Sequence, residues 1–185
     1  MPIKESVNKQ TELLKKSEIS LWINHYDYIF SDFDHRPYSE RSLSDDFISE
    51  AKRAARDKAS GQIELKFLVP KNIREVFTEK TIKSRLKDHF KKHTAEKLKE
   101  YKKVIFQGLS FILMGIIFMA LTTFILIRQA YSSSLITFLS VLFEPAGWFL
   151  FWEGLNLMIF ETKRKSPDLE FYEKMSEADI NFSDY

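Results

Sequence analysis

The chain has 185 residues, a formal net charge of +2 and no cysteine, and 44% of its residues are hydrophobic. The lack of cysteine excludes a cysteine nucleophile and fits a reducing compartment. Residues 1–22 lack the apolar region of a secretory signal, so a cleaved leader is not expected.

Residues 1–77 predict a small α+β domain. Its helix is expected in SLSDDFISEAKRAARDKASG, where Ser44 is the candidate N-cap and two aspartates occupy the first turn. Gly61 follows the last turn, which is a typical position for a helix stop.

A strand is predicted in QIELKFLVP, because Ile63, Leu65 and Phe67 alternate with the other side chains until Pro70 ends the pattern. A single strand has to pair with another one. The candidate partner is ISLWINHYDYIF, residues 19–30, which is rich in β-branched and aromatic residues. A strand from another subunit is the alternative.

Residues 78–103 predict a basic juxtamembrane helix that runs into the first apolar run. Apolar residues recur there mostly at helical intervals, and neither glycine nor proline interrupts the pattern. A coiled-coil stalk and packing on the chain's own domain are both open. Such a helix would carry movement of the domain directly into the membrane.

Two apolar runs predict an integral membrane protein, mainly α, with a transmembrane hairpin over residues 104–160. Residues 104–127 contain no charged side chain, and residues 135–160 contain only two glutamates. At about 1.5 Å per residue, each helix is long enough to cross a hydrocarbon core of roughly 30 Å. Two core helices of a soluble protein are the alternative, but the rest of the chain is too polar to cover them.

The flanking charges predict the orientation. Positive residues lie before the first span and after the second, whereas the connection at residues 128–134 has one arginine. Positive charge is retained on the cytoplasmic side, so both termini are expected inside, at the plasma (inner) membrane. The residues expected to contact anionic lipid head groups are Lys91, Lys92, Lys99, Lys102, Lys103, Lys163, Arg164 and Lys165.

Charge is distributed in blocks. Residues 18–50 carry a net charge of −6, residues 51–103 a net charge of +10, and the cytosolic acidic tail at residues 161–185 a net charge of −3. The acidic segments are expected to fold against the basic block or to compete for it. No nucleic-acid partner is expected, because the basic block adjoins the membrane and lipid is the nearer polyanion.

Two glutamates and a proline interrupt the second span in FEPAGWFLFWEGLN, residues 143–156. Pro145 lacks a backbone N–H, so the helix is expected to kink there or to restart, which would place Glu144 at the N-terminus of a shorter helix. In a continuous helix Glu144 and Glu153 point to opposite faces, because nine positions leave them half a turn apart.

Glu153 is predicted to form a polar seam with Asn156 and Gln107, which faces the hairpin interior or a neighbouring subunit. An ionisable group at that depth costs on the order of 2.5–3.5 kcal/mol on insertion scales. Two helices cannot enclose a cavity for it. A homo-oligomer is therefore expected, with Glu144, Glu153 or both at its interior or at a subunit contact.

Four further residues are expected to pack the helices. Gly108 and Gly115 offer small surfaces for close approach, and their spacing of seven positions places them on one face. Trp148 and Trp152 lie too deep for an interfacial belt. They are expected to pack against a neighbour or to donate a hydrogen bond to a glutamate.

Two clusters of potential metal ligands occur in the sequence, but neither has the full pattern of a metal site. His89, His93 and Glu96 share one face of the predicted helix, as metal ligands do, but lysines surround them and a solvated face is expected. Asp32 and Asp34 lack the glycine and terminal glutamate of a calcium loop, so the carboxylates of this segment are expected to pair with basic residues of the following helices or to accept backbone hydrogen bonds in turns. Without a nucleophile elbow or a phosphate loop, neither a cofactor nor an enzymatic activity is expected.

Two functional hypotheses remain. The first is an oligomeric ion pore or membrane effector, lined by glutamates and gated by the cytosolic domain. The second is a non-conducting membrane scaffold that recruits a cytosolic partner. A metal-dependent membrane enzyme rests only on His89 and His93. The layout resembles that of two-span effector proteins of prokaryotic defence systems, which usually carry more chain after the second span.

Overall fold

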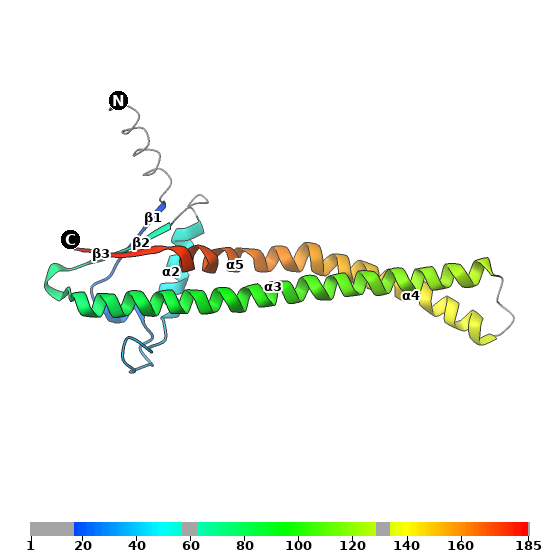
Figure 1. Ribbon diagram of the computed structural model, residues 1–185, viewed down its shortest axis with the longest axis horizontal. Coiled ribbons are helices and arrows are strands. Elements are labelled where there is room, and N and C mark those ends of the chain that lie inside the picture. The colour runs from blue at the N-terminus through cyan, green and yellow to red at the C-terminus, as the bar shows by residue number, and fades with distance from the viewer. Residues whose placement is uncertain (1–16, 57–62, 129–133, 185) are drawn as a thin grey trace, which may run out of the picture. The chain divides into compact units, whose positions relative to one another are not determined.

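The computed structural model in Figure 1 describes residues 17–56, 63–128 and 134–184. The described chain is mostly helical and divides into two compact units. We call them the sheet unit, with the described residues up to Ala95 and from Glu170, and the apolar hairpin, residues 96–169. In chain order the elements are β1 (Ser17–Trp22), the 3-10 helix η1 (Tyr26–Ile29), α2 (Asp45–Arg56), β2 (Ile63–Val69), the 3-10 helix η2 (Lys71–Ile73), α3 (Val76–Ile127), α4 (Ser134–Asn156), the π-helix η3 (Leu157–Glu161), α5 (Thr162–Glu177) and β3 (Asp179–Asp184).

The sheet unit is built on three parallel strands with β2 in the middle. Leu65 of β2 is in register with Ile19 of β1 on one side and with Ile180 of β3 on the other. The predicted strand is confirmed, and its partner comes from the expected segment, of which only the first part is extended. The second partner, β3, lies in the acidic tail and was not predicted.

Parallel strands need long crossover connections. η1, a loop and α2 connect β1 to β2, whereas the whole apolar hairpin lies between β2 and β3 in the sequence. The segments before and after the hairpin are therefore parts of one sheet.

α2 begins as the sequence predicts. The Ser44 hydroxyl accepts hydrogen bonds from the backbone N–H groups of Asp46 (3.2 Å) and Phe47 (3.5 Å), which is the N-cap arrangement. The described helix ends at Arg56. The expected stop at Gly61 lies outside the described residues.

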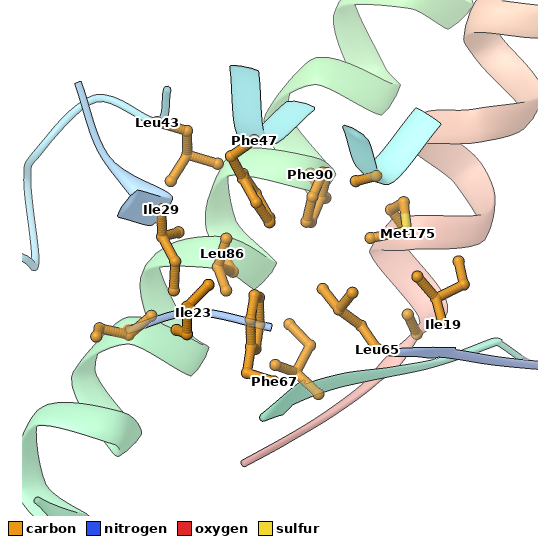
Figure 2. Close-up of a cluster of buried hydrophobic side chains, with 14 of the residues drawn as sticks. Ile19, Ile23, Ile29, Leu43, Phe47, Leu65, Phe67, Leu86, Phe90 and Met175 are labelled. Atoms are coloured by element: carbon orange, nitrogen blue, oxygen red, sulfur yellow. The ribbon is translucent and has the colours of Figure 1, made fainter. Parts of the chain in front are cut away.

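The core of the sheet unit lies between the sheet and the helices α2, α3 and α5 (Figure 2). Phe67 of β2 is completely buried and stacks on Phe182 of β3, with ring centroids 5.0 Å apart. Residues 78–90 of α3 pack on the chain's own domain, which is one of the two arrangements expected for the basic helix, the other being a coiled-coil stalk. The helices contribute Phe47, Ala51, Ala55, Ile82, Leu86, Phe90, Phe171, Tyr172 and Met175.

Arg74 connects the start of α3 to β3, because it binds both the buried Glu79 carboxylate and residues of β3. Glu79 is 7% exposed and accepts hydrogen bonds from Arg74 Nε (2.9 Å), Arg74 Nη2 (3.0 Å) and the Tyr26 hydroxyl (3.0 Å). Arg74 also donates to the Phe182 carbonyl (3.2 Å) and pairs with Asp184 (3.4 Å). The hydrogen bonds from Arg74 outweigh the effect of burial and hold the pKa of Glu79 below its ordinary value.

The apolar hairpin confirms the predicted continuity of the long helix, because α3 is one helix of 52 residues. α4 runs through Pro145, so the helix does not restart there. Since Pro145 has no N–H, the Val141 carbonyl lacks its usual intrahelical donor.

Two helical runs are long and apolar enough to cross a membrane: α3, and the run from Ser134 to Glu177 that includes α4, η3 and α5. Only 11% of the most apolar window of each run is buried. A core helix of a soluble protein is mostly covered, and these are not.

Candidate functional site

The interior of the hairpin is a seam of small side chains. From Gly108 onward on α3, and along α4, the buried positions recur every seven residues. Because a seven-residue repeat keeps one face of a helix towards its partner, the seam runs lengthwise between the helices. Its members are Gly108, Gly115 and Thr122 on α3, and Ser140, Gly147 and Gly154 on α4.

The two backbones approach too closely for larger side chains. A Cβ atom on Gly154 would lie 2.6 Å from the Gly108 carbonyl oxygen, and one on Gly115 would lie 2.7 Å from the Gly147 carbonyl oxygen. Real Cβ contacts are almost never this short. The glycines singled out in the sequence, Gly108 and Gly115, thus lie at the crossing, and no polar path fits between the helices of one chain at these levels.

The four polar residues singled out in the apolar runs, Gln107, Glu144, Glu153 and Asn156, lie outside this seam. Glu153 and Asn156 line one groove of about 300 Å³ on the outer face of α4. Gln107 is exposed on α3 and does not line this groove, so the structure does not bring the expected three-residue seam together. Glu144 is exposed on α4 outside the groove.

Aromatic and aliphatic side chains form the rest of the groove, which we call the Glu153 groove. Trp152, 61% exposed, is one of its walls, whereas Trp148 is exposed elsewhere on α4. Neither tryptophan is covered by the chain itself. The groove is lined by Phe149, Trp152, Glu153, Leu155, Asn156, Ile159 and Phe160.

A π-helical turn ends the groove. η3 begins immediately after Asn156 and contains Ile159 and Phe160, two of the lining residues. π-helical turns are rare and occur frequently at functional sites, because the wider turn displaces side chains from their regular positions. The sequence carries no local pattern that predicts this turn.

The basic residues that flank the hairpin are mostly exposed, as contact with lipid head groups requires. Lys165 is the exception. It is half-buried and lies 3.5 Å from Glu100, which also pairs with Lys97 at 3.4 Å. These lysines lower the pKa of Glu100, Lys97 having the larger effect.

The histidine pair of α3 lies side by side, with the ring centroids of His89 and His93 4.2 Å apart. Burial lowers the pKa of His89 to about 4, and the charges of His93, Arg85 and Lys92 act in the same direction. A metal site needs further ligands. Within residues 17–56, 63–128 and 134–184 no three histidine or carboxylate side chains come together to hold an ion, so Glu96 does not complete such a site.

The aspartates of the loop after β1 have structural partners. Asp27 pairs with Arg41 at 2.6 Å. Asp34 accepts hydrogen bonds from Arg36 (2.8 Å) and from the backbone N–H of Ser42 (2.7 Å), and these bonds hold the pKa of Asp34 well below its usual range. The expected backbone hydrogen bonds are found at Asp34, but the expected pairing with basic residues of the following helices is wrong for Asp27 and Asp34, because their partners Arg41 and Arg36 belong to the loop itself.

No protein family, characterised protein or solved structure matches this chain. Its function therefore has to be inferred from its own residues. The feature of the hairpin that stands out is the groove shared by Glu153 and Asn156 on the outer face of α4.

Proposed function

We propose that the chain is a homo-oligomeric integral membrane protein in which the Glu153 groove faces a neighbouring subunit or a central pore. The observation that carries the proposal is the position of Glu153 and Asn156 in one outer groove of α4, a helix whose only other charged residue is Glu144. Left against lipid, the carboxyl group costs on the order of 2.5–3.5 kcal/mol on insertion scales. A second copy that covers the groove, or water in a shared pore, removes this cost.

The sheet supports the proposed membrane topology. β2 precedes both apolar helices and β3 follows them, yet the two strands pair. Segments that share one sheet lie on the same side of a membrane, so the chain has to cross an even number of times. Together with the lysines at both flanks, this favours a cytoplasmic location for β2 and β3, with the hairpin crossing a plasma membrane.

The first experiment measures the oligomeric mass of the full chain in detergent. We expect a discrete oligomer of four or more subunits for the wild type and a smaller or heterogeneous mass for Glu153→Leu, because the variant removes the polar group that the contact satisfies. Gln107→Leu is the matched control, since Gln107 is exposed outside the groove. A monomer in both proteins would contradict the proposal.

Ion conduction is the more specific proposal, and it is tested by flux into liposomes. If the groove lines a pore, Glu153→Gln should change the flux or its cation selectivity, since charged rings govern selectivity in pores. A wild-type protein that forms the oligomer without any flux would contradict conduction alone.

A scaffold function remains the second candidate because most groove residues are apolar, as in a packed interface. It predicts that Glu153→Gln weakens assembly and that the oligomer conducts nothing. The sheet unit would then recruit the cytosolic partner.

A further inference from the structure

A second groove, in the sheet unit, combines cationic, hydroxyl and aromatic side chains. It has a volume of about 360 Å³ and runs along one face of α3 beside the loop that precedes α2. Binding sites for small molecules start at roughly this size. It is lined by Ser39 from the loop and by Phe77, Lys80, Thr81, Ser84, Arg85 and Asp88 from α3.

The loop wall of this groove is held in place without a ligand. Arg85 donates from Nε to the Arg41 carbonyl oxygen at 2.9 Å, which ties the loop to α3. Arg41 in turn pairs with Asp27 and donates to the Ser31 carbonyl oxygen (3.2 Å). Because the wall is already ordered, a ligand that binds here does not have to order it.

The polar residues of the groove favour an anion. Lys80 and Arg85 both line the groove and are about 7.5 Å apart along the helix axis and roughly 140° apart around it, so they lie at opposite edges of the groove, where a phosphate group can bind between them. Lys80 has no ion pair or hydrogen bond within the described residues. Asp88 lines the far end and leaves the groove with a net charge of +1. Ser84 supplies a hydroxyl donor between the two cations.

The aromatic residue of the groove lies at the opposite end from Asp88. Phe77 is 77% exposed in the first turn of α3. An exposed ring beside a cation offers a stacking surface to a flat ring of a ligand.

We propose that this groove binds a small phosphate ester that carries an aromatic ring, with the phosphate between Lys80 and Arg85 and the ring on Phe77. The chemistry is that of a mononucleotide. Asp88 accepts a hydrogen bond from a hydroxyl or amino group of the same ligand. The inference concerns the sheet unit alone and does not depend on oligomerisation or conduction.

Calorimetry with the full chain in phosphatidylcholine nanodiscs tests the proposal, with AMP as the probe. AMP should bind more tightly than ribose 5-phosphate, which lacks the ring, and than adenosine, which lacks the phosphate. Lys80→Gln and Phe77→Ala should each weaken AMP binding about tenfold. Lys87→Gln and Val76→Ala are matched controls on exposed positions of α3 outside the groove, and they should bind like the wild type.

Three results would overturn the proposal. The first is the absence of AMP binding at millimolar concentration. The second is binding that is indifferent to Lys80→Gln and Phe77→Ala. The third is loss of AMP binding when phosphatidylglycerol is added to the nanodiscs, because the occupant of the groove would then be a lipid head group. Each of these results can be observed whether or not the protein conducts ions, so the test does not depend on the proposed function.

Discussion

At the scale of single residues, the ion pair of Arg74 and Glu79 is expected to be the most sensitive to mutation. Arg74→Met leaves the buried Glu79 carboxylate without its main partner, which should lower the free energy of unfolding by about 3 kcal/mol. Pulse proteolysis in urea, on the full chain in detergent, measures this difference.

The matched control is Arg53→Met. Arg53 pairs with Glu50 on the exposed surface of α2, where the side chains are 75% and 50% exposed. Exposed pairs contribute roughly 0–1 kcal/mol. Equal losses of stability in the two variants would show that the buried network is no stronger than a surface pair.

The histidine pair predicts a dependence of stability on pH. The pKa of His89 is about 4 in the folded protein against 6.5 for the ordinary group, so the unfolded chain binds more protons between these values. The free energy of unfolding should therefore fall as the pH is lowered from about 6.5. The fall is less than about 1.4 kcal/mol per pH unit, which is the largest slope that the binding of one proton can cause. The free energy of unfolding between pH 7 and 5 checks this.

Between pH 7 and 5, His89→Gln should make the free energy of unfolding depend less on pH. His35→Gln, at an exposed loop position, should leave this dependence unchanged. The lowered pKa of Glu79 does not interfere, because a depressed carboxyl pKa removes stability only as the pH falls below its ordinary value near 4.5. An unchanged slope in His89→Gln would rule out His89 as the source.

At the scale of elements, the glycines of the hairpin seam set the distance between α3 and α4. Gly154→Ala places a Cβ atom 2.6 Å from the Gly108 carbonyl oxygen and 2.8 Å from the Ile112 backbone nitrogen, and neither atom can move without its helix. We expect a loss of about 1–3 kcal/mol, measured as a lower thermal midpoint in detergent. Ala120→Val, on the exposed face of α3, should leave the midpoint nearly unchanged.

Local patterns in the sequence were sufficient for several elements. α2 follows from its Ser44 cap, β2 from its alternation before Pro70, and α3 from an uninterrupted helical pattern. Each of these patterns is contained within one element, so neighbouring residues are enough to recognise it.

The elements that the sequence did not predict depend on residues far apart in the chain. β3 has only Ile180 and Phe182 as alternating apolar residues within a polar tail, and it becomes a strand because β2 offers a free edge. Gly147 and Gly154 repeat the seven-residue spacing of Gly108 and Gly115, a pattern that would have identified the seam. The direction of Glu153 depends on that seam and could not be predicted without it.

At the scale of the whole molecule, the sheet unit needs chain from both sides of the hairpin. We expect a fragment of residues 1–103 to lack a protease-resistant sheet unit, because Ile180, Phe182 and Met175 of the later segment complete its core. Limited proteolysis of the fragment beside the full chain checks this. Equal resistance would show that β1, β2 and their helices fold alone.

The same feature sets an order of events during synthesis. About 110 residues separate the end of β2 from the start of β3, and at about 5–20 residues per second a ribosome takes roughly 5–20 seconds to make them. Throughout this interval one edge of β2 is open and able to pair with other nascent chains. The sheet unit closes only after the hairpin has been made, so a chain whose hairpin fails to reach its destination also lacks a finished sheet and is open to proteases and chaperones.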